Sequence, residues 1–169
     1  VKREVTRIVT PGTNLDTYAL DETKNNYIMC IVYVDNKYGV SVADVTTGAY
    51  FVTELDSERK LLDEISKYMP SEIISNEAFF MSGIDLADLR HRLGITIYSL
   101  ESWYFGDDLA ATTLKEHFHV ASLDGLGLGD YNCGVIAAGS LLKYLYETQK
   151  TTLDHMTTIE PYSTGKFMV

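Results

Sequence analysis

Apolar and polar positions in the first third of the chain predict three consecutive strands. The segment YIMCIVYV, residues 27–34, is almost continuously apolar, which indicates a strand buried on both faces. Residues 38–45 alternate, with Val40 and Val42 on one face. A third strand follows at 49–55, and the short turns on either side of the second strand predict an antiparallel meander.

Helical and extended segments alternate in the rest of the chain. The periodicity predicts helices at 57–69, 83–94, 107–118 and 133–149, and strands at 71–75 and 95–100. Asp56 is expected to cap the first helix and Asn132 the last, and Pro70 is expected to end the first. A strand that follows a helix in this way implies a parallel partner in the sheet.

The element order is therefore β-β-β-α-β-α-β-α-α, which is the order of the RNase H-like fold. We predict an α/β fold with a mixed sheet, in which a three-stranded antiparallel meander is joined by parallel strands and flanked by helices. Small residues in the last helix, Gly134, Ala137, Ala138 and Gly139, predict close packing on the sheet. Residues 155–169 are expected to form an extended exit segment with short strands.

Charge narrows the range of partners. The net charge of −10 argues against broad contact with nucleic acid, because phosphate binding needs clustered Lys and Arg. The basic cluster of the chain is Lys2, Arg3 and Arg7, so any direct DNA contact is expected there. An acidic surface otherwise favours solubility or a protein partner.

Composition and the first residues indicate the class of protein. Hydrophobic residues make up 46% of the 169, enough for the core of one domain. No apolar run approaches the ~18 residues of a membrane helix. The polar start lacks a signal peptide and an initiator Met, so we expect a piece cut from a longer chain. Cys30 and Cys133 are expected to be reduced core thiols of a cytoplasmic protein.

Asp44, in the hairpin YGVSVADVTTGAYF, is the first candidate catalytic residue. RNase H-like nucleases use several carboxylates that converge on two metal ions. Here the first strand has no acid until Asp35, and the strand at 71–75 offers Glu72 alone. An Asp before a Thr-Thr-Gly turn can instead accept hydrogen bonds from turn amides, so Asp44 and Gly48 are interpreted as turn residues. A metal-dependent nuclease remains the alternative.

Two other candidate sites are weak. The GLGLGD segment, 125–130, lacks the G-x-G-x-x-G spacing of a dinucleotide loop, although the loop at 121–131 could bind a ligand in a free-standing domain. The four histidines do not have the spacing of a zinc site, since His117 and His119 point to different faces of a helix. We expect no cofactor and no metal in this chain.

The helix at 107–118 has two possible roles. Its expected apolar side carries Leu109, Leu114 and Phe118, and its polar side carries Thr112, Thr113, Lys115 and Glu116. It could be an ordinary surface helix or a docking surface.

Several stretches, taken in order, resemble one family. These are REVTRIVTPGT (3–13), NNYIMCI (25–31), YGVSVADVTTGAYFVTEL (38–55), PSEII (70–74) and AAGSLLKYLYETQKTTLDHM (137–156). Together they resemble the connector domain of the MutS family of DNA mismatch repair proteins. The resemblance implies a linker at 1–12, a connector domain at 13–155 and an exit segment at 156–169 toward the core and lever domains.

The resemblance also implies a function. A connector of this family has an RNase H-like fold without nuclease carboxylates, so it is not an enzyme, and Asp44 becomes a turn residue. It transmits conformational change between mismatch-binding and ATPase domains and contributes to docking of MutL, here through Thr112, Thr113 and Glu116. Mismatched DNA, ATP and Mg²⁺ bind other domains of the full-length protein, which is expected to be a cytoplasmic homodimer.

Overall fold

The computed structural model describes residues 26–84, 86–149 and 153–162. Its strands are β1 (Tyr27–Val34), β2 (Lys37–Asp44), β3 (Ala49–Leu55), β4 (Glu72–Ser75), β5 (Thr96–Ser99) and β6 (Glu160–Pro161). Its helices are α2 (Glu58–Tyr68), α3 (Glu77–Phe80), α4 (Leu86–Arg92), α5 (Asp107–Phe118) and α6 (Cys133–Thr148), with 3₁₀ helices η2 (Ser102–Phe105) and η3 (Leu123–Leu126). None of the described helices is long and apolar enough to cross a membrane.

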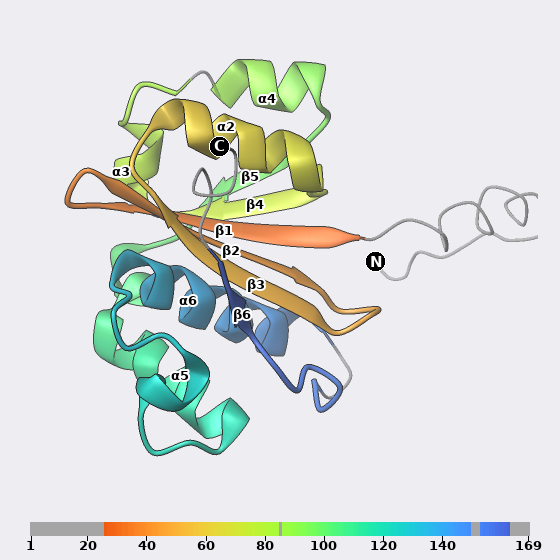
Figure 1. Ribbon diagram of the computed structural model, residues 1–169. Coiled ribbons are helices and arrows are strands. Elements are labelled where there is room, and N and C mark those ends of the chain that lie inside the picture. Colours follow the sequence, from red (N-terminus) through yellow and green to blue (C-terminus); the bar gives the residue numbers. More distant parts are fainter. Residues whose placement is uncertain (1–25, 85, 150–152, 163–169) are drawn as a thin grey trace, which may run out of the picture.

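The six strands form one mixed sheet in the order β5-β4-β1-β2-β3-β6 (Figure 1). β2 runs antiparallel to both β1 and β3, whereas β4 is parallel to β1, β5 to β4, and β6 to β3. A meander continued by parallel strands on the side of β1 is the RNase H-like arrangement. The predicted fold class is confirmed.

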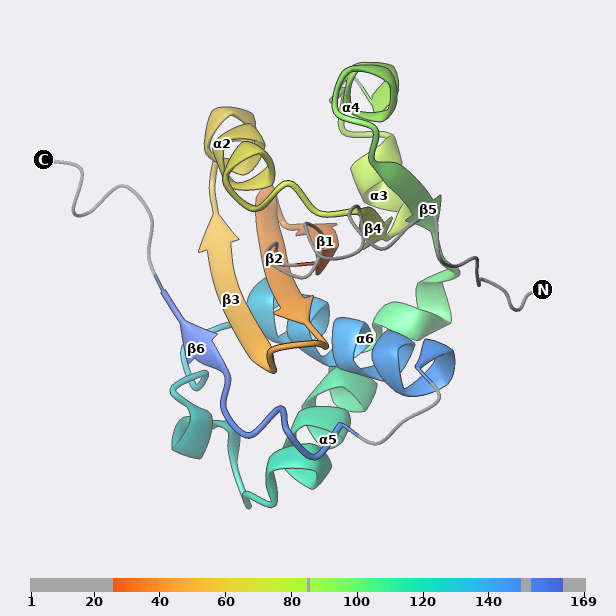
Figure 2. The same cartoon turned by 90° about the vertical axis from the view of Figure 1, so that its right-hand side faces the viewer.

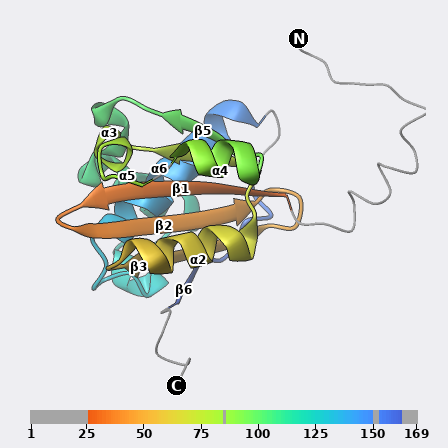
Figure 3. The ribbon, with the colours of Figure 1, turned by 90° about the horizontal axis from the view of Figure 1, so that it is seen from above.

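Helices cover both faces of the sheet. Figure 2 shows α2, α3 and α4 on one side and α5 and α6 on the other. Seen from above, α2 runs along β2 and β3, with α4 beside it toward β5 (Figure 3). The side chains of β1 alternate between two cores: Ile28, Cys30 and Val32 face α5 and α6, while Met29 and Ile31 face α2. This double burial explains the almost continuous apolar run of β1.

The hairpin between β1 and β2 turns on two residues with positive φ, Asp35 at 54° and Asn36 at 65°. Both angles belong to the type I′ turn, whose twist matches that of the strands. The predicted turn at these residues is confirmed.

Of the two predicted helix caps, Asp56 is wrong and Asn132 is right in position only. The N-cap of α2 is Ser57, whose hydroxyl accepts from the Lys60 backbone N–H, while Asp56 pairs with the Lys60 ammonium instead. Asn132 is the N-cap residue of α6, as predicted, but its side chain makes no capping hydrogen bond. The Glu54 carboxylate on β3 accepts from the backbone N–H groups of Asn132 at 2.6 Å and Gly134 at 2.8 Å. A carboxylate there complements the positive end of the helix dipole.

Short elements differ most from the prediction. The helix α3, η2 and η3 were not predicted, and the helix expected at 83–94 extends over Leu86–Arg92 in the structure. Of the predicted exit segment at 156–169, residues 156–162 are described, and they contain the single short strand β6. The predicted linker at 1–12, with Lys2, Arg3 and Arg7, lies outside the described residues.

Candidate docking groove

Asp44 ends β2 and is fully buried. Its Oδ1 accepts a hydrogen bond from the Thr46 backbone N–H at 2.9 Å, and its Oδ2 accepts from the Asn26 backbone N–H at 3.2 Å. The Gly48 N–H donates to the Asp44 carbonyl at 2.8 Å, and Gly48 has a φ of +84°. Both carboxylate oxygens of Asp44 are therefore engaged by the backbone around this turn.

The predicted helix at 107–118 is α5, with those bounds. Ala110 and Leu114 are its buried residues, whereas Leu109 is 37% exposed, so the predicted apolar side is wrong at Leu109. Thr112 and Glu116 are exposed, as expected for a polar side. The Thr113 hydroxyl donates to the Leu109 carbonyl at 2.8 Å. Leu109 is thus an exposed apolar side chain that lies beside the predicted polar residues and is available for contact with a partner.

The two helices α5 and α6 cross closely. A Cβ built on Gly139 of α6 would lie 2.4 Å from the Ala110 Cα and 2.5 Å from the Ala110 carbonyl oxygen. Backbone therefore meets backbone at this crossing, which only glycine permits. The prediction that Gly139 packs on the sheet is wrong, because this glycine contacts α5.

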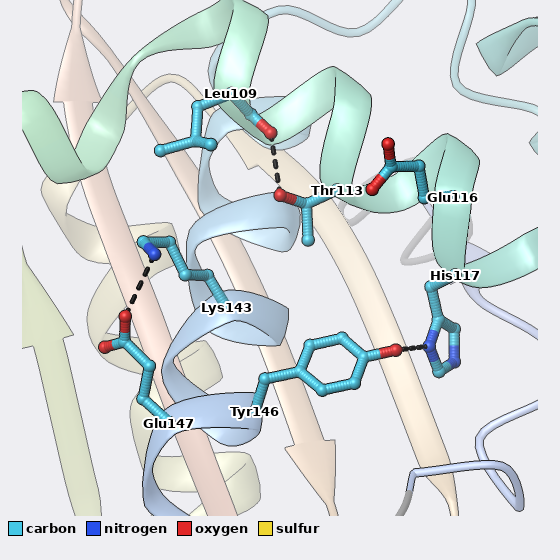
Figure 4. Close-up of a pocket in the computed structure, with 7 residues that line it drawn as sticks. All are labelled: Leu109, Thr113, Glu116, His117, Lys143, Tyr146 and Glu147. Atoms are coloured by element: carbon cyan, nitrogen blue, oxygen red, sulfur yellow. Dashed lines mark hydrogen bonds and ion pairs between the residues drawn. The ribbon is translucent and has the colours of Figure 1, made fainter.

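Beside this crossing, the two helices line a groove of about 310 Å³, whose side chains Figure 4 shows. Its lining is shared between the helices: Leu109, Thr113, Glu116 and His117 from α5, and Lys143, Tyr146 and Glu147 from α6. Two of the predicted docking residues, Thr113 and Glu116, lie in it. Thr112 does not line it. We call this surface the docking groove.

His117 and Tyr146 close one end of the docking groove. The His117 Nδ1 lies 2.5 Å from the Tyr146 hydroxyl. Figure 4 shows the two side chains pointing toward one another. A second hollow of about 360 Å³ begins on the far side of this pair and reaches Asp154, Met156 and Thr157. The two hollows share Glu116, His117 and Tyr146, so the groove extends from the helices to the start of the exit segment.

The docking groove is lined by apolar and aromatic side chains, Leu109 and Tyr146, together with the acidic Glu116 and Glu147. Tyr146 is 51% exposed, and Trp103, which lies outside the lining, is 61% exposed. The Lys143 ammonium lies 5.7 Å from the Trp103 ring centre and is bonded to Glu147 at 2.9 Å. This hydrogen bond to Lys143 is the main cause that lowers the pKa of Glu147. Lys143 is paired with Glu147, whereas Glu116 has no ion pair with any residue that the structure describes.

Comparison with known proteins identifies the family. Residues 26–157 match the family described as MutS domain II. The chain belongs to the MutS domain II family. Domain II is the connector domain of the MutS mismatch repair proteins.

Curated MutS relatives match the chain along its whole length. The DNA mismatch repair protein MutS of Lachnoclostridium phytofermentans is 57% identical over 169 residues, which cover 100% of this chain and 18% of that protein. The MutS of Protochlamydia amoebophila is 36% identical over 170 residues, covering 100% of the chain and 20% of the relative. The chain thus spans about a fifth of the length of the curated relatives that it matches.

A solved structure of T. thermophilus RuvC in complex with a Holliday junction substrate also matches, with 10% identity and a TM-score of 0.49. The match covers 75% of this chain and 97% of RuvC.

In this MutS domain II chain, the histidines and cysteines considered as metal or catalytic residues do not form a common site among the described residues. No three His, Cys, Asp or Glu side chains among the described residues are grouped to hold a metal ion. His117 and His155 each bind a backbone carbonyl, of Met156 and Val45 respectively. Cys30 and Cys133 are free and buried. Burial raises the pKa of the Cys133 thiol to about 12, with the nearby Glu54 adding to the effect.

Sequence reasoning missed the half of the docking groove that α6 supplies. A signal for it was present, because Lys143, Tyr146 and Glu147 are spaced i, i+3 and i+4 at the end of an otherwise apolar helix. That spacing places the three side chains on one exposed face. Nothing in the sequence indicated that this face would lie beside Thr113 and Glu116 of α5.

Proposed function

We propose that this chain is the non-catalytic connector of a MutS mismatch repair protein. It transmits conformational change between the mismatch-binding and ATPase domains, and its docking groove contributes to binding MutL. The observation that carries the docking proposal is that Leu109 and Tyr146, both exposed, line the same groove as Thr113 and Glu116. Exposed aromatic residues beside a groove are typical anchors of protein interfaces.

Charge indicates the kind of surface that would fit the docking groove. Glu116 lies on its rim, Asp154 lies in the adjoining hollow, and the whole chain carries a net charge of −10. A complementary surface on MutL would present an apolar side chain flanked by Lys or Arg. Such complementarity speeds association and suppresses wrong partners more than it adds affinity.

The contacts of the exit segment support a role in transmission. Met156 belongs to the core on the α5 and α6 side, while the Tyr162 hydroxyl bonds to Glu64 on α2. The exit segment therefore contacts both helical layers of the domain. A rigid domain that contacts the exit segment on both sides of its sheet can transmit a rotation to the domain that follows.

The engagement of Asp44 supports the absence of catalysis by this domain. Its carboxylate is held by the amides of Asn26 and Thr46, and it would need further carboxylates to bind two metal ions. We propose that ATP, Mg²⁺ and mismatched DNA bind other domains of the whole protein, which acts in the cytoplasm as a homodimer.

A titration of the ¹⁵N-labelled chain with the ATP-bound N-terminal domain of MutL tests the docking proposal. We expect chemical shift changes to cluster on the amides of α5 and α6 around Thr113, Glu116 and Tyr146. Tyr146→Ala is expected to weaken binding at least tenfold, roughly 1.4 kcal/mol. The matched control is Tyr98→Ala, since Tyr98 is 45% exposed on β5 and lines neither hollow.

Two outcomes would contradict the docking proposal. Shifts that cluster away from α5 and α6 would move the site elsewhere on the domain. Equal weakening by Tyr146→Ala and Tyr98→Ala would show that the docking groove is not the contact surface.

A further inference from the structure

His117 lines the docking groove and is bonded both to α6 and to the exit segment. Its Nδ1 lies 2.5 Å from the Tyr146 hydroxyl on α6, and its Nε2 lies 2.7 Å from the Met156 carbonyl oxygen in the exit segment. These contacts link α5 to residues that are 29 and 39 positions away in sequence.

The Met156 carbonyl fixes the direction of one hydrogen bond, and in a neutral imidazole ring the direction of the other follows from it. A carbonyl oxygen can only accept, so Nε2 carries the proton and donates to Met156. In the neutral ring Nδ1 is then an acceptor, and the Tyr146 hydroxyl donates to it. Burial, with the Asp154 charge adding to it, raises the pKa of Tyr146, so the phenol keeps its proton. The result is a directed chain from Tyr146 through His117 to Met156.

Hydrogen bonds in such a chain polarise one another. When the Tyr146 hydroxyl donates to Nδ1, it withdraws electron density from the imidazole ring. The Nε2–H group then becomes a stronger donor to the Met156 carbonyl. The state of a hydroxyl in the docking groove thus affects how firmly the exit segment is bound.

We propose that His117 is a positioning residue that couples occupancy of the docking groove to the strength of the hydrogen bond that holds the exit segment at Met156. A partner that accepts the Tyr146 hydroxyl withdraws it from Nδ1, and the bond from Nε2 to Met156 weakens. The exit segment is then held less firmly at Met156. The coupling rests on the proposed function for the identity of the partner, MutL, while the chain of hydrogen bonds belongs to this domain alone.

The simpler alternative is that His117 only staples three elements together. A staple contributes to overall stability, and its loss affects all protected amides alike. If His117 couples the two sites, the stability of the exit segment depends on a group that is bonded to His117 and not to the exit segment. The Tyr146 hydroxyl is such a group, because it is hydrogen-bonded to His117.

Tyr146→Phe removes this hydroxyl and keeps the ring. The reporters are the backbone amides of Met156, bonded to the Leu153 carbonyl, and Tyr162, bonded to the Val52 carbonyl, both at 3.0 Å. We expect hydrogen exchange at Met156, normalised to the amides of β1, to become roughly two- to tenfold faster. Exchange at Tyr162 should change less, because β6 is held separately by β3.

Tyr144→Phe is the matched control. Tyr144 lies on the same helix and also donates a phenolic hydrogen bond, to Glu72 at 2.9 Å, but it has no contact with His117 or the exit segment in the described contacts. Its normalised exchange at Met156 should be unchanged. Equal acceleration in Tyr144→Phe and Tyr146→Phe would overturn the proposal and leave His117 as a staple.

Two substitutions of His117 test the hydrogen bonds of its two ring nitrogens one at a time. His117→Gln keeps a donor near the position of Nε2 and removes the link to Tyr146, while His117→Asn keeps a group near Nδ1 and removes the link to Met156. Exchange at Met156 should then no longer respond to Tyr146→Phe in the Gln background, as a double-mutant cycle would measure. A response that persists in that background would also overturn the coupling.

These measurements contain no MutL, so they stand whether or not MutL binds the docking groove. If His117→Gln fails to fold, the comparison of Tyr146→Phe with Tyr144→Phe still decides, because Tyr146 is half exposed and its ring is retained. A chain without coupling that binds MutL would refute this inference alone. A coupled chain that ignores MutL would refute the docking proposal alone.

Discussion

The Tyr162 hydroxyl donates a 2.5 Å hydrogen bond to the Glu64 carboxylate, which joins the exit segment to α2. Glu64 is buried, at 6% exposure, and its second neighbour is the Lys67 ammonium at 3.9 Å. Burial raises the pKa of Tyr162, with the bond to Glu64 adding to the effect. Among the described residues, this phenol is the hydrogen-bond donor of the buried Glu64 carboxylate, and a buried carboxylate is costly without a donor.

Tyr162→Phe is therefore expected to lower the free energy of unfolding by about 1–3 kcal/mol, because Glu64 loses its short hydrogen bond. Urea unfolding followed by circular dichroism measures the change. The control is Tyr33→Phe, which removes an exposed bond of 3.3 Å to Asn36 and should change the free energy by about 0.5 kcal/mol or less. Equal effects of the two substitutions would show that the exit segment is not held through Glu64.

Buried tyrosines predict a loss of stability at alkaline pH. Burial raises the pKa of Tyr50, whose hydroxyl donates to the Ala138 carbonyl at 2.5 Å, and also that of Tyr104. In the unfolded chain both titrate near pH 10. Above that pH the unfolded state binds fewer protons than the folded state, so stability is complete below pH 10 and falls as the pH rises further.

The slope of that fall can be assigned to single residues. Tyr50, which is 2% exposed, should contribute about 1.4 kcal/mol per pH unit above pH 10. Urea unfolding between pH 8 and about pH 11 should show this slope, and it should be shallower in Tyr50→Phe. An unfolding free energy with the same slope in both proteins would contradict the assignment to Tyr50.

The crossing of α5 and α6 at Gly139 predicts a specific steric defect. Gly139→Ala places a methyl group 2.4 Å from the Ala110 Cα, so α5 must move away from α6. Overpacking of this kind costs about 1–3 kcal/mol. The same substitution at Gly125 meets only ordinary contacts with Val120, at 3.6 Å or more, and serves as the control.

Gly139→Ala should also disturb the docking groove that the two helices form. Binding of the MutL N-terminal domain is the readout, and we expect it to weaken in Gly139→Ala and to be unchanged in Gly125→Ala. Unchanged unfolding and unchanged binding in Gly139→Ala would mean that the helices can separate at this crossing without cost.

Elements with strong local patterns could be predicted from the sequence. The two-sided apolar run of β1, the turn at Asp35 and Asn36 and the helix α5 follow from periodicity and turn chemistry, and the structure confirms them. Such patterns depend on neighbours within a few residues. The cap of α2 is different, because Asp56 and Ser57 are both good N-cap residue types and the local sequence does not distinguish them. The structure uses Ser57.

Contacts between residues far apart in sequence could not be predicted. Glu54, 78 positions before Asn132, supplies the side-chain hydrogen bonds at the start of α6 that Asn132 was expected to make. Leu109 and Gly139 were assigned to the wrong neighbours for the same reason: periodicity gives the face of a helix but not what that face meets. The α6 half of the docking groove depends on that missing information.

Asp44→Asn separates the turn role from the nuclease alternative. An amide offers one acceptor oxygen, so its NH₂ group would face the N–H of either Asn26 or Thr46 and leave that donor without a partner. We expect a loss of about 1–3 kcal/mol in the free energy of unfolding, measured in urea. The control Asp63→Asn, on the exposed side of α2, should change it by about 0.5 kcal/mol or less.

Cleavage assays on the same proteins complete the test. Each protein is incubated with Mn²⁺ and with single-stranded DNA, duplex DNA or an RNA–DNA hybrid. A connector has no activity to lose, so neither the parent chain nor Asp44→Asn should release products above the protein-free background. Mn²⁺-dependent cleavage by the parent chain that disappears in folded Asp44→Asn would establish the nuclease instead. In that case the amides of Asn26 and Thr46 would have to release Asp44 for it to reach a metal, because both of its oxygens are engaged in this turn.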